Sequence, residues 1–258
     1  MLKAIKARLQ QGYRTTSYPD GPPPELPRHF AGLPVIDSSK CLPACRQCIP
    51  ACPTQALDID TRTRQVSLDT GRCLFCRECQ RVCPAGAIQF SRDFRLASSS
   101  RERLVVTDSS PLPAVELDGA IVRLLGRSLK LRQVSAGGCN ACEADTNVLG
   151  TVGWDLGRFG IQFVASPRHA DGLLITGPVT ENTRLALEKT YQAVPSPKIV
   201  IAVGACAISG GPYLDHPEAH NGAASLVPVD VYVPGCPPHP LTILHALLAT
   251  IGRLPRGL

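Results

Sequence analysis

The feature that most constrains this chain is a cysteine run that occurs twice. The second copy reads Cys-x2-Cys-x2-Cys-x3-Cys-Pro over residues 73–84, and its last part, Cys79-x3-Cys83-Pro84, repeats Cys48-x3-Cys52-Pro53 after 31 residues. Three thiolates at this spacing surround one face of a 4Fe–4S cluster, and the proline then turns the chain so that the fourth thiolate binds the other cluster. The repeat therefore predicts a small two-cluster ferredoxin-like α+β domain.

Exchange of the fourth ligand between the copies predicts two sets of four cysteines. One 4Fe–4S cluster is expected on Cys73, Cys76, Cys79 and Cys52, and the other on Cys41, Cys45, Cys48 and Cys83. The first copy opens with three residues between its first two cysteines instead of two, so its cluster could be of another type, such as three-iron, or have a changed potential. Zinc is the main alternative, although zinc sites usually separate two cysteine pairs by a dozen or more residues.

From residue 130 onward, strand and helix patterns alternate. Apolar runs predict strands at 131–136, 161–165, 172–176, 199–203 and 229–233, with helices at 143–150, at 181–193 and from residue 240 onward. Several runs are continuously apolar, which is typical of parallel strands covered on both faces. This pattern predicts a flavodoxin-like, doubly wound α/β domain with a parallel sheet.

Four further cysteines lie in the loops of this second domain. Cys139 and Cys142 follow the first predicted strand, Cys206 follows the fourth and Cys236 follows the fifth. Open α/β sheets bind ligands just beyond the carboxyl ends of their strands. The alternative is a group of unrelated core cysteines, which are common. Their shared placement, with glycine beside each loop, favours one further iron–sulfur cluster.

These signals divide the chain into four parts: an N-terminal helix with a proline-rich docking arm (1–34), the two-cluster domain (35–95), a linker with a helix (96–129) and the α/β domain (130–258). Leu2, Ile5 and Leu9 are spaced to share one helix face among basic residues. This helix either packs on its own domain or docks to a partner or a membrane surface.

Composition and charge argue against nucleic-acid binding and indicate where the protein is located. The net charge of +6 is spread along 258 residues without an aromatic-interleaved basic patch, so nucleic-acid binding is not expected. No apolar run is long enough to span a bilayer, and the start has no signal-peptide core, so we expect a cytosolic location. Twelve cysteines in such a chain indicate metal ligation more than disulfides.

The chain also resembles known subunits. Residues 130–253 resemble the small subunit of membrane-bound, energy-converting nickel–iron hydrogenases, as in the formate hydrogenlyase complex, over GGCNACE (137–143), RFGIQFVASPRHADGLLITGPVT (158–180), PKIVIAVGACAISGG (197–211) and VDVYVPGCPPHP (229–240). The related complex I subunit has adjacent cysteines where this chain has Cys139-x2-Cys142, which favours the hydrogenase side. Residues 1–105 resemble the two-cluster ferredoxin subunit of the same complexes, so the chain looks like a fusion.

The resemblance implies that Cys139, Cys142, Cys206 and Cys236 hold the proximal 4Fe–4S cluster, the third of the chain. That cluster would face the nickel–iron centre of a separate large subunit, and the chain would have no catalytic residue of its own. The implied location is peripheral, on the cytoplasmic side of the membrane within a larger complex, with a donor such as ferredoxin, formate dehydrogenase or CO dehydrogenase. The alternatives are a quinone-reducing or nickel-free relative of complex I, and a free ferredoxin-type carrier.

A few polar residues have two interpretations each. Glu143 either helps to move protons or is a carboxylate favoured by a helix N-terminus. Arg168 and His169 have either a functional role, contact with the large subunit or tuning of the neighbouring cluster, or a structural role in a salt bridge. His216 and His220 are interpreted as ordinary loop histidines rather than a metal pair. The glycine pairs match no nucleotide-binding motif.

Overall fold

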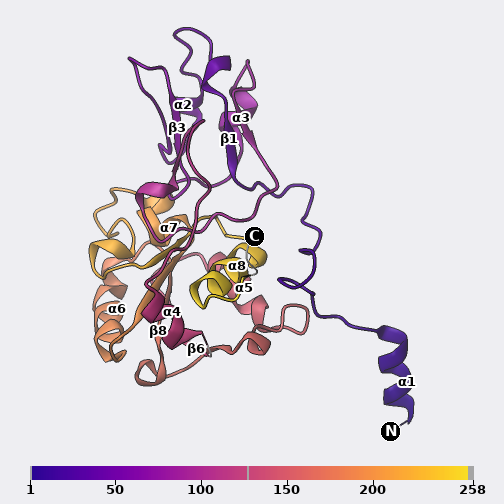
Figure 1. Ribbon diagram of the computed structural model, residues 1–258. Coiled ribbons are helices and arrows are strands. Elements are labelled where there is room, and N and C mark those ends of the chain that lie inside the picture. The colour runs from indigo at the N-terminus through magenta and orange to yellow at the C-terminus, as the bar shows by residue number, and fades with distance from the viewer. Residues whose placement is uncertain (1, 127, 255–258) are drawn as a thin grey trace.

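The computed structural model describes residues 2–126 and 128–254 as two modules stacked end to end, with an N-terminal helix on an extended arm (Figure 1). The first part of the chain contains α1 (Leu2–Gln11), β1 (Pro34–Ile36), α2 (Cys48–Ala51), β2 (Leu57–Ile59), β3 (Val66–Asp69), α3 (Glu78–Val82), β4 (Ile88–Phe90), β5 (Val105–Val106) and α4 (Gly119–Leu125). The second contains β6 (Leu129–Ser135), α5 (Ala141–Asn147), β7 (Ile161–Phe163), β8 (Gly172–Thr176), α6 (Glu181–Ala193), β9 (Ile199–Val203), α7 (Ala205–Ser209), β10 (Val231–Val233) and α8 (Pro240–Thr250).

The first module is built from two small antiparallel sheets. β1 pairs with β4, and β3 lies between β2 and β5. The buried side chains form one cluster that includes Val66, Leu68 and Ile88 together with cysteines of the repeat. The predicted ferredoxin-like α+β fold is confirmed. β5 lies beyond residue 95, so part of the segment expected to be a linker completes the sheet of this module.

The second module is a five-stranded parallel sheet, as predicted, and its strands follow the order β10-β9-β8-β6-β7. Side chains of β8 alternate between its two faces. Leu174 packs into the cluster that contains Leu244 of α8, whereas Leu173 and Ile175 pack into the cluster that contains Leu187 of α6. Helices therefore cover both faces of the sheet, and the carboxyl ends of the strands point toward the first module.

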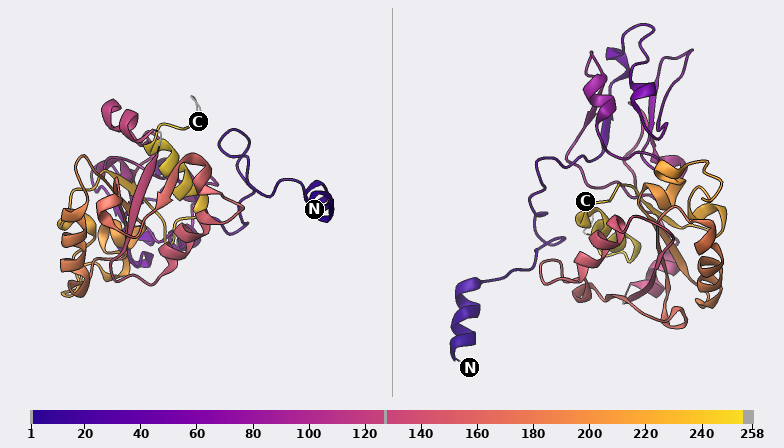
Figure 2. Two further views of the ribbon diagram at one scale, coloured as in Figure 1. Left: turned by 90° about the horizontal axis from the view of Figure 1, so that it is seen from below. Right: turned by 180° about the vertical axis from the view of Figure 1, so that it is seen from behind.

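The helix α1 does not pack on either module. Both views in Figure 2 show it apart from the rest of the chain, and none of its residues is buried. Leu2 and Leu9 are 84% and 79% exposed, and Ile5 is 53% exposed. The prediction that this helix packs on its own domain is therefore wrong for the described residues. Its apolar face is exposed, which agrees with the other alternative, docking to a partner or a membrane surface.

Candidate iron–sulfur sites

Two small cavities in the first module are lined by the cysteines of the repeat. One is lined by Cys41, Cys45, Cys48 and Cys83. The other is lined by Cys52, Cys73, Cys76 and Cys79. The structure thus brings together the same two sets of four that ligand exchange between the copies predicts, and the last cysteine of each copy lies with the other copy.

Tight turns place these thiols around the cavities. In the longer spacing of the first copy, the amide of Cys45 donates to the carbonyl of Leu42 at 3.2 Å, and Ala44 has a positive φ of 59°. This turn takes up the extra residue and leaves both flanking cysteines at the cavity. In the second copy Phe75 and Arg77 have positive φ values of 55° and 62°. The chain therefore coils closely around each cavity.

Backbone amides point at the cysteine sulfurs. The amides of Ala56 and Ala87 donate to Cys52 Sγ and Cys83 Sγ at 3.2 and 3.3 Å, at matching places in the two copies. The amide of Phe75 donates to Cys73 Sγ at 3.2 Å. Such bonds stabilise a negatively charged sulfur and are typical of iron–sulfur sites.

The third set of cysteines gathers where the sheet of the second module faces the first module. Cys139 and Cys142 lie on either side of the start of α5, Cys206 lies in the first turn of α7, and Cys236 follows β10. Burial raises the pKa of Cys206 to about 12, with further contributions from the nearby Cys236 and Cys139. Burial and the thiols of Cys206, Cys236 and Cys139 likewise raise the pKa of Cys142. The four thiols are therefore close neighbours, although Cys139 and Cys236 are exposed.

Two glycines lie so close to these sulfurs that a larger residue would not fit. A Cβ atom on Gly204 would lie 2.5 Å from Cys142 Sγ, and one on Gly211 would lie 2.9 Å from Cys206 Sγ. In the described residues no three His, Cys, Asp or Glu side chains are placed to hold a single metal ion. Four thiols grouped in this way fit an iron–sulfur cluster instead.

The second and third sets lie next to each other. Cys236 is exposed as a residue, but the protein around its sulfur is the main cause that raises its pKa; Cys139 and Cys76 raise it further, so a thiol of the first module lies within electrostatic reach of the second. A cleft of about 500 Å³ is lined both by Leu74 and Phe75 of the first module and by the loop around Cys236. The three sets therefore follow one another through the molecule.

Glu143 anchors the start of α5. Its side chain is buried, and its carboxylate accepts hydrogen bonds from Ser135 Oγ at 2.5 Å and Thr176 Oγ1 at 2.7 Å. Burial alone would raise the pKa of Glu143, but the two hydroxyl groups outweigh it and hold that pKa below its usual value. The carboxylate therefore ties α5 to β6 and β8, which favours the structural interpretation of this residue.

Among the described residues, the remaining polar candidates form no hydrogen bond or ion pair with a cysteine. Arg168 and His169 are exposed in the 3-10 helix Pro167–His169, and neither forms an ion pair among the described residues. His216 Nδ1 accepts from the amide of Glu218, whereas His220 Nε2 lies 2.6 Å from Glu181 Oε2. The two histidines thus take different partners, as expected for ordinary loop residues.

Comparison with known proteins places these modules. The family model described as NADH ubiquinone oxidoreductase, 20 kDa subunit, matches residues 139–250, and a 4Fe-4S dicluster domain matches residues 39–87. A probable membrane-bound hydrogenase subunit of Pyrococcus furiosus is 41% identical over 134 residues, which cover 52% of this chain and 80% of that protein. Formate hydrogenlyase subunit 7 of Escherichia coli is also 41% identical, over 54% of each chain, so this chain spans about half of that relative.

The matches extend to respiratory relatives. An NADH-quinone oxidoreductase subunit of Clostridium beijerinckii is 44% identical over 112 residues, which cover 43% of this chain and 66% of that protein. Among solved structures, a chain of an archaeal membrane-bound sulfane sulfur reductase is 36% identical, covers 53% of this chain and 73% of its own length, and has a TM-score of 0.43.

Proposed function

Since the chain belongs to the family of the 20 kDa subunit of NADH–ubiquinone oxidoreductase and its hydrogenase relatives, we propose that it relays electrons through three 4Fe–4S clusters to or from the nickel–iron site of a partner large subunit, for reversible H2 chemistry. It is an iron–sulfur electron-transfer subunit of an oxidoreductase complex. The single observation that carries the proposal is the gathering of all twelve cysteines into three neighbouring sets of four.

The assignment of clusters follows these sets. Two clusters belong to the domain at residues 35–95, and the third, on Cys139, Cys142, Cys206 and Cys236, belongs to the domain at residues 130–258. When bound, the clusters accept and donate single electrons. The chain supplies thiolates, amide hydrogen bonds to sulfur and apolar walls that exclude water, and these set each potential. The exposed edge at Cys139 and Cys236 is where we place the large subunit.

The hydrogenase interpretation rests on two relatives of 41% identity that are named as hydrogenase or formate hydrogenlyase subunits. The quinone-reducing or nickel-free alternative rests on the NADH-quinone oxidoreductase relatives. The test is to isolate the native complex without oxygen, through a tag on this chain, and to measure nickel, iron and viologen-linked H2 turnover. We expect nickel near one per complex together with H2 activity. Iron for three clusters without nickel or H2 activity would exclude the nickel–iron partner.

We also propose a peripheral position on the cytoplasmic side of a membrane. Among the described residues, no helix is both long and apolar enough to cross a bilayer. The exposed face of α1 combines Leu2, Ile5 and Leu9 with basic neighbours, a composition that favours the surface of an anionic bilayer.

Replacing Leu2, Ile5 and Leu9 together by serine is therefore expected to weaken binding to anionic vesicles. Each lost apolar side chain should lower the affinity by roughly tenfold, because its burial in the bilayer boundary is worth about 1.5 kcal/mol or more. Vesicle co-sedimentation measures this, with Leu185→Ser as the control, since Leu185 is an exposed leucine on α6. Equal binding of the triple variant and the control would contradict a role for α1 at the membrane.

A side-chain hydroxyl lies beside a cysteine sulfur in the first copy of the repeat and has no counterpart in the second. The buried Thr54 hydroxyl lies 3.9 Å from Cys52 Sγ, whereas the matching place in the other copy is Ala85. Thr54→Ala should lower the potential of the Cys52-Cys73-Cys76-Cys79 cluster by on the order of 20 mV, because a bond worth about 0.5 kcal/mol to the reduced, more negative form is lost. Ala85→Thr should raise the potential of the other cluster. Redox titration followed by EPR measures both, and a potential that does not change in Thr54→Ala would contradict the role of the hydroxyl.

A further inference from the structure

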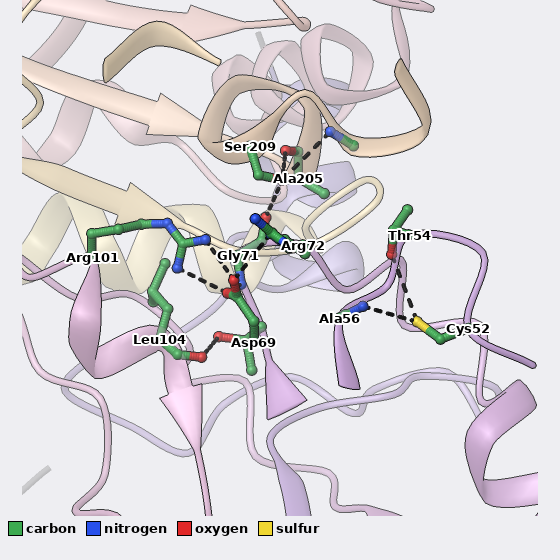
Figure 3. Close-up of polar contacts among 12 residues, drawn as sticks. Cys52, Thr54, Ala56, Asp69, Gly71, Arg72, Arg101, Leu104, Ala205 and Ser209 are labelled. Carbon is green, nitrogen blue, oxygen red and sulfur yellow. Dashed lines mark hydrogen bonds and ion pairs between the residues drawn. The ribbon is translucent and has the colours of Figure 1, made fainter. Parts of the chain in front are cut away.

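The two modules touch directly at the turn that leads into Cys73. Ser209 Oγ at the end of α7 lies 3.0 Å from the carbonyl oxygen of Gly71 and 3.1 Å from that of Ala205 (Figure 3). Ser209 is buried, and Gly71 lies 138 residues away in the chain. The contact thus sits two residues before Cys73 of the second set and on the same short helix as Cys206 of the third set.

Gly71 lies close to one side chain of the second module, Ile208, and to two side chains of its own module. A Cβ atom there would lie 2.9 Å from Ile208 Cγ2, 3.0 Å from Leu104 Cδ1 and 3.1 Å from Arg101 Cζ. Leu104 is fully buried in a cluster that includes Ile208 of α7. An added methyl group would therefore act as a wedge between the turn and Ile208 of α7, one of which must shift to admit it.

Asp69 fixes the shape of this turn. Its carboxylate forms a two-fold ion pair with Arg101, at 2.9 and 2.6 Å, and accepts from the amide of Gly71 at 2.9 Å (Figure 3). Its carbonyl accepts from the amide of Cys73 at 3.0 Å. Because paired, bidentate bonds of this kind fix direction as well as distance, the path from Asp69 to Cys73 has one conformation.

We propose that Gly71 and Ser209 are positioning residues that fix the separation between the cluster of the second cysteine set and the cluster of the third, and so set the rate of electron transfer between them. This inference rests on the proposed function. Electron tunnelling slows steeply as two centres move apart. Leu74 and Phe75, which follow Cys73, line one cleft together with Cys236, so a shift of the turn against α7 changes this separation directly. A wedge at position 71 increases it.

The test uses the full chain with its clusters assembled without oxygen. Gly71→Ala and Ser209→Ala are compared with two controls. Gly119→Ala adds a Cβ that meets only Arg123 Nη1 at 3.5 Å, and Ser225→Ala removes a hydroxyl that bonds Gly222 within the second module. Three quantities are measured: iron content, the magnetic interaction between the reduced clusters by EPR, and the rate of electron equilibration after pulsed reduction.

Gly71→Ala is expected to keep wild-type iron and potentials but to show a weaker magnetic interaction and several-fold slower equilibration. Ser209→Ala should likewise weaken the magnetic interaction and slow the equilibration. Ser209→Thr keeps a hydroxyl, so its interaction and rate should lie between those of Ser209→Ala and the wild type. Both controls should match the wild type. Wild-type interaction and rate in an iron-replete Gly71→Ala variant would overturn the proposal. If Gly71→Ala loses its clusters, the Ser209→Ala variant decides: wild-type magnetic interaction and wild-type rate in iron-replete Ser209→Ala would overturn the proposal. A wild-type chain without a third cluster would instead refute the proposed function, before any variant is made.

Discussion

Replacing Gly204 by alanine is expected to remove the cluster of the third cysteine set and leave the two others in place. Gly204 has a φ of +92°, which favours glycine, and it links β9 to α7. Its amide donates to the carbonyl of Val233 at 2.9 Å, so the loop that carries Cys236 is held beside it. A Cβ atom would lie 2.5 Å from Cys142 Sγ, which is far inside contact distance. The substitution therefore strains the backbone and displaces a proposed ligand at once.

The measurement is iron content together with EPR of the reduced chain. Iron should fall by one cluster's worth, one of the EPR signals should disappear, and H2 turnover of the complex should be lost because the proposed relay is broken. Gly150→Ala is the matched control within the same module, since a Cβ there meets nothing within 4 Å. A Gly204→Ala chain with full iron and an unchanged spectrum would show that Cys142 does not bind a cluster there.

Removal of iron is expected to unfold the first module while the second stays folded. The helices α2 and α3 have four and five residues, and the strands of this module have two to four. Its buried cluster contains three cysteines, Cys48, Cys73 and Cys79, among small apolar groups. A module of this size buries too little apolar surface to be stable alone, and structural metal sites contribute on the order of 10 kcal/mol to folding.

Hydrogen exchange read by mass spectrometry compares the chain with and without iron. Amides of residues 34–106 should lose nearly all protection after chelation, whereas amides of β8 and β9 should keep it. Every residue of these two strands is buried, and their side chains form clusters without Cys48, Cys73 or Cys79. Protection of the first module that survives complete loss of iron would mean that its sheets carry the stability instead.

The local sequence pattern predicts the bounds of a strand well where the strand is one continuous apolar run. The strands at 172–176 and 199–203 were predicted to the residue, because an unbroken apolar run admits one interpretation in a sheet covered on both faces. The last strand was predicted from residue 229 but begins at Val231. Asp230 explains the difference, since its carboxylate accepts from the amide of Val200 at 2.8 Å in place of a regular ladder bond. The helix predicted from residue 143 begins at Ala141, because Asn140 adopts a φ of 70° and starts it earlier.

The contacts between the modules could not be predicted from the sequence. Nothing in the sequence near Gly71 indicates that Ser209 will lie against it, because the contact depends on how two separately folded units meet. The Thr54 contact, in contrast, had a visible signal that was missed. Aligning the two copies of the repeat sets Cys52-Pro53-Thr54 against Cys83-Pro84-Ala85, and a hydroxyl present in only one copy marks a difference in the surroundings of the two clusters.

The junction at Gly71 lies within one polypeptide, and this connection adds to its stability. Two separate proteins that meet at such a junction lose translational and rotational freedom on association. Here the segment between the modules packs Phe94 and Ala97 into the core cluster of the second module and pairs Ser98 with Tyr232, so it holds both surfaces together at a high effective concentration. The ratio of the two modules is one to one at any protein concentration, and the path between their clusters is the same in every molecule.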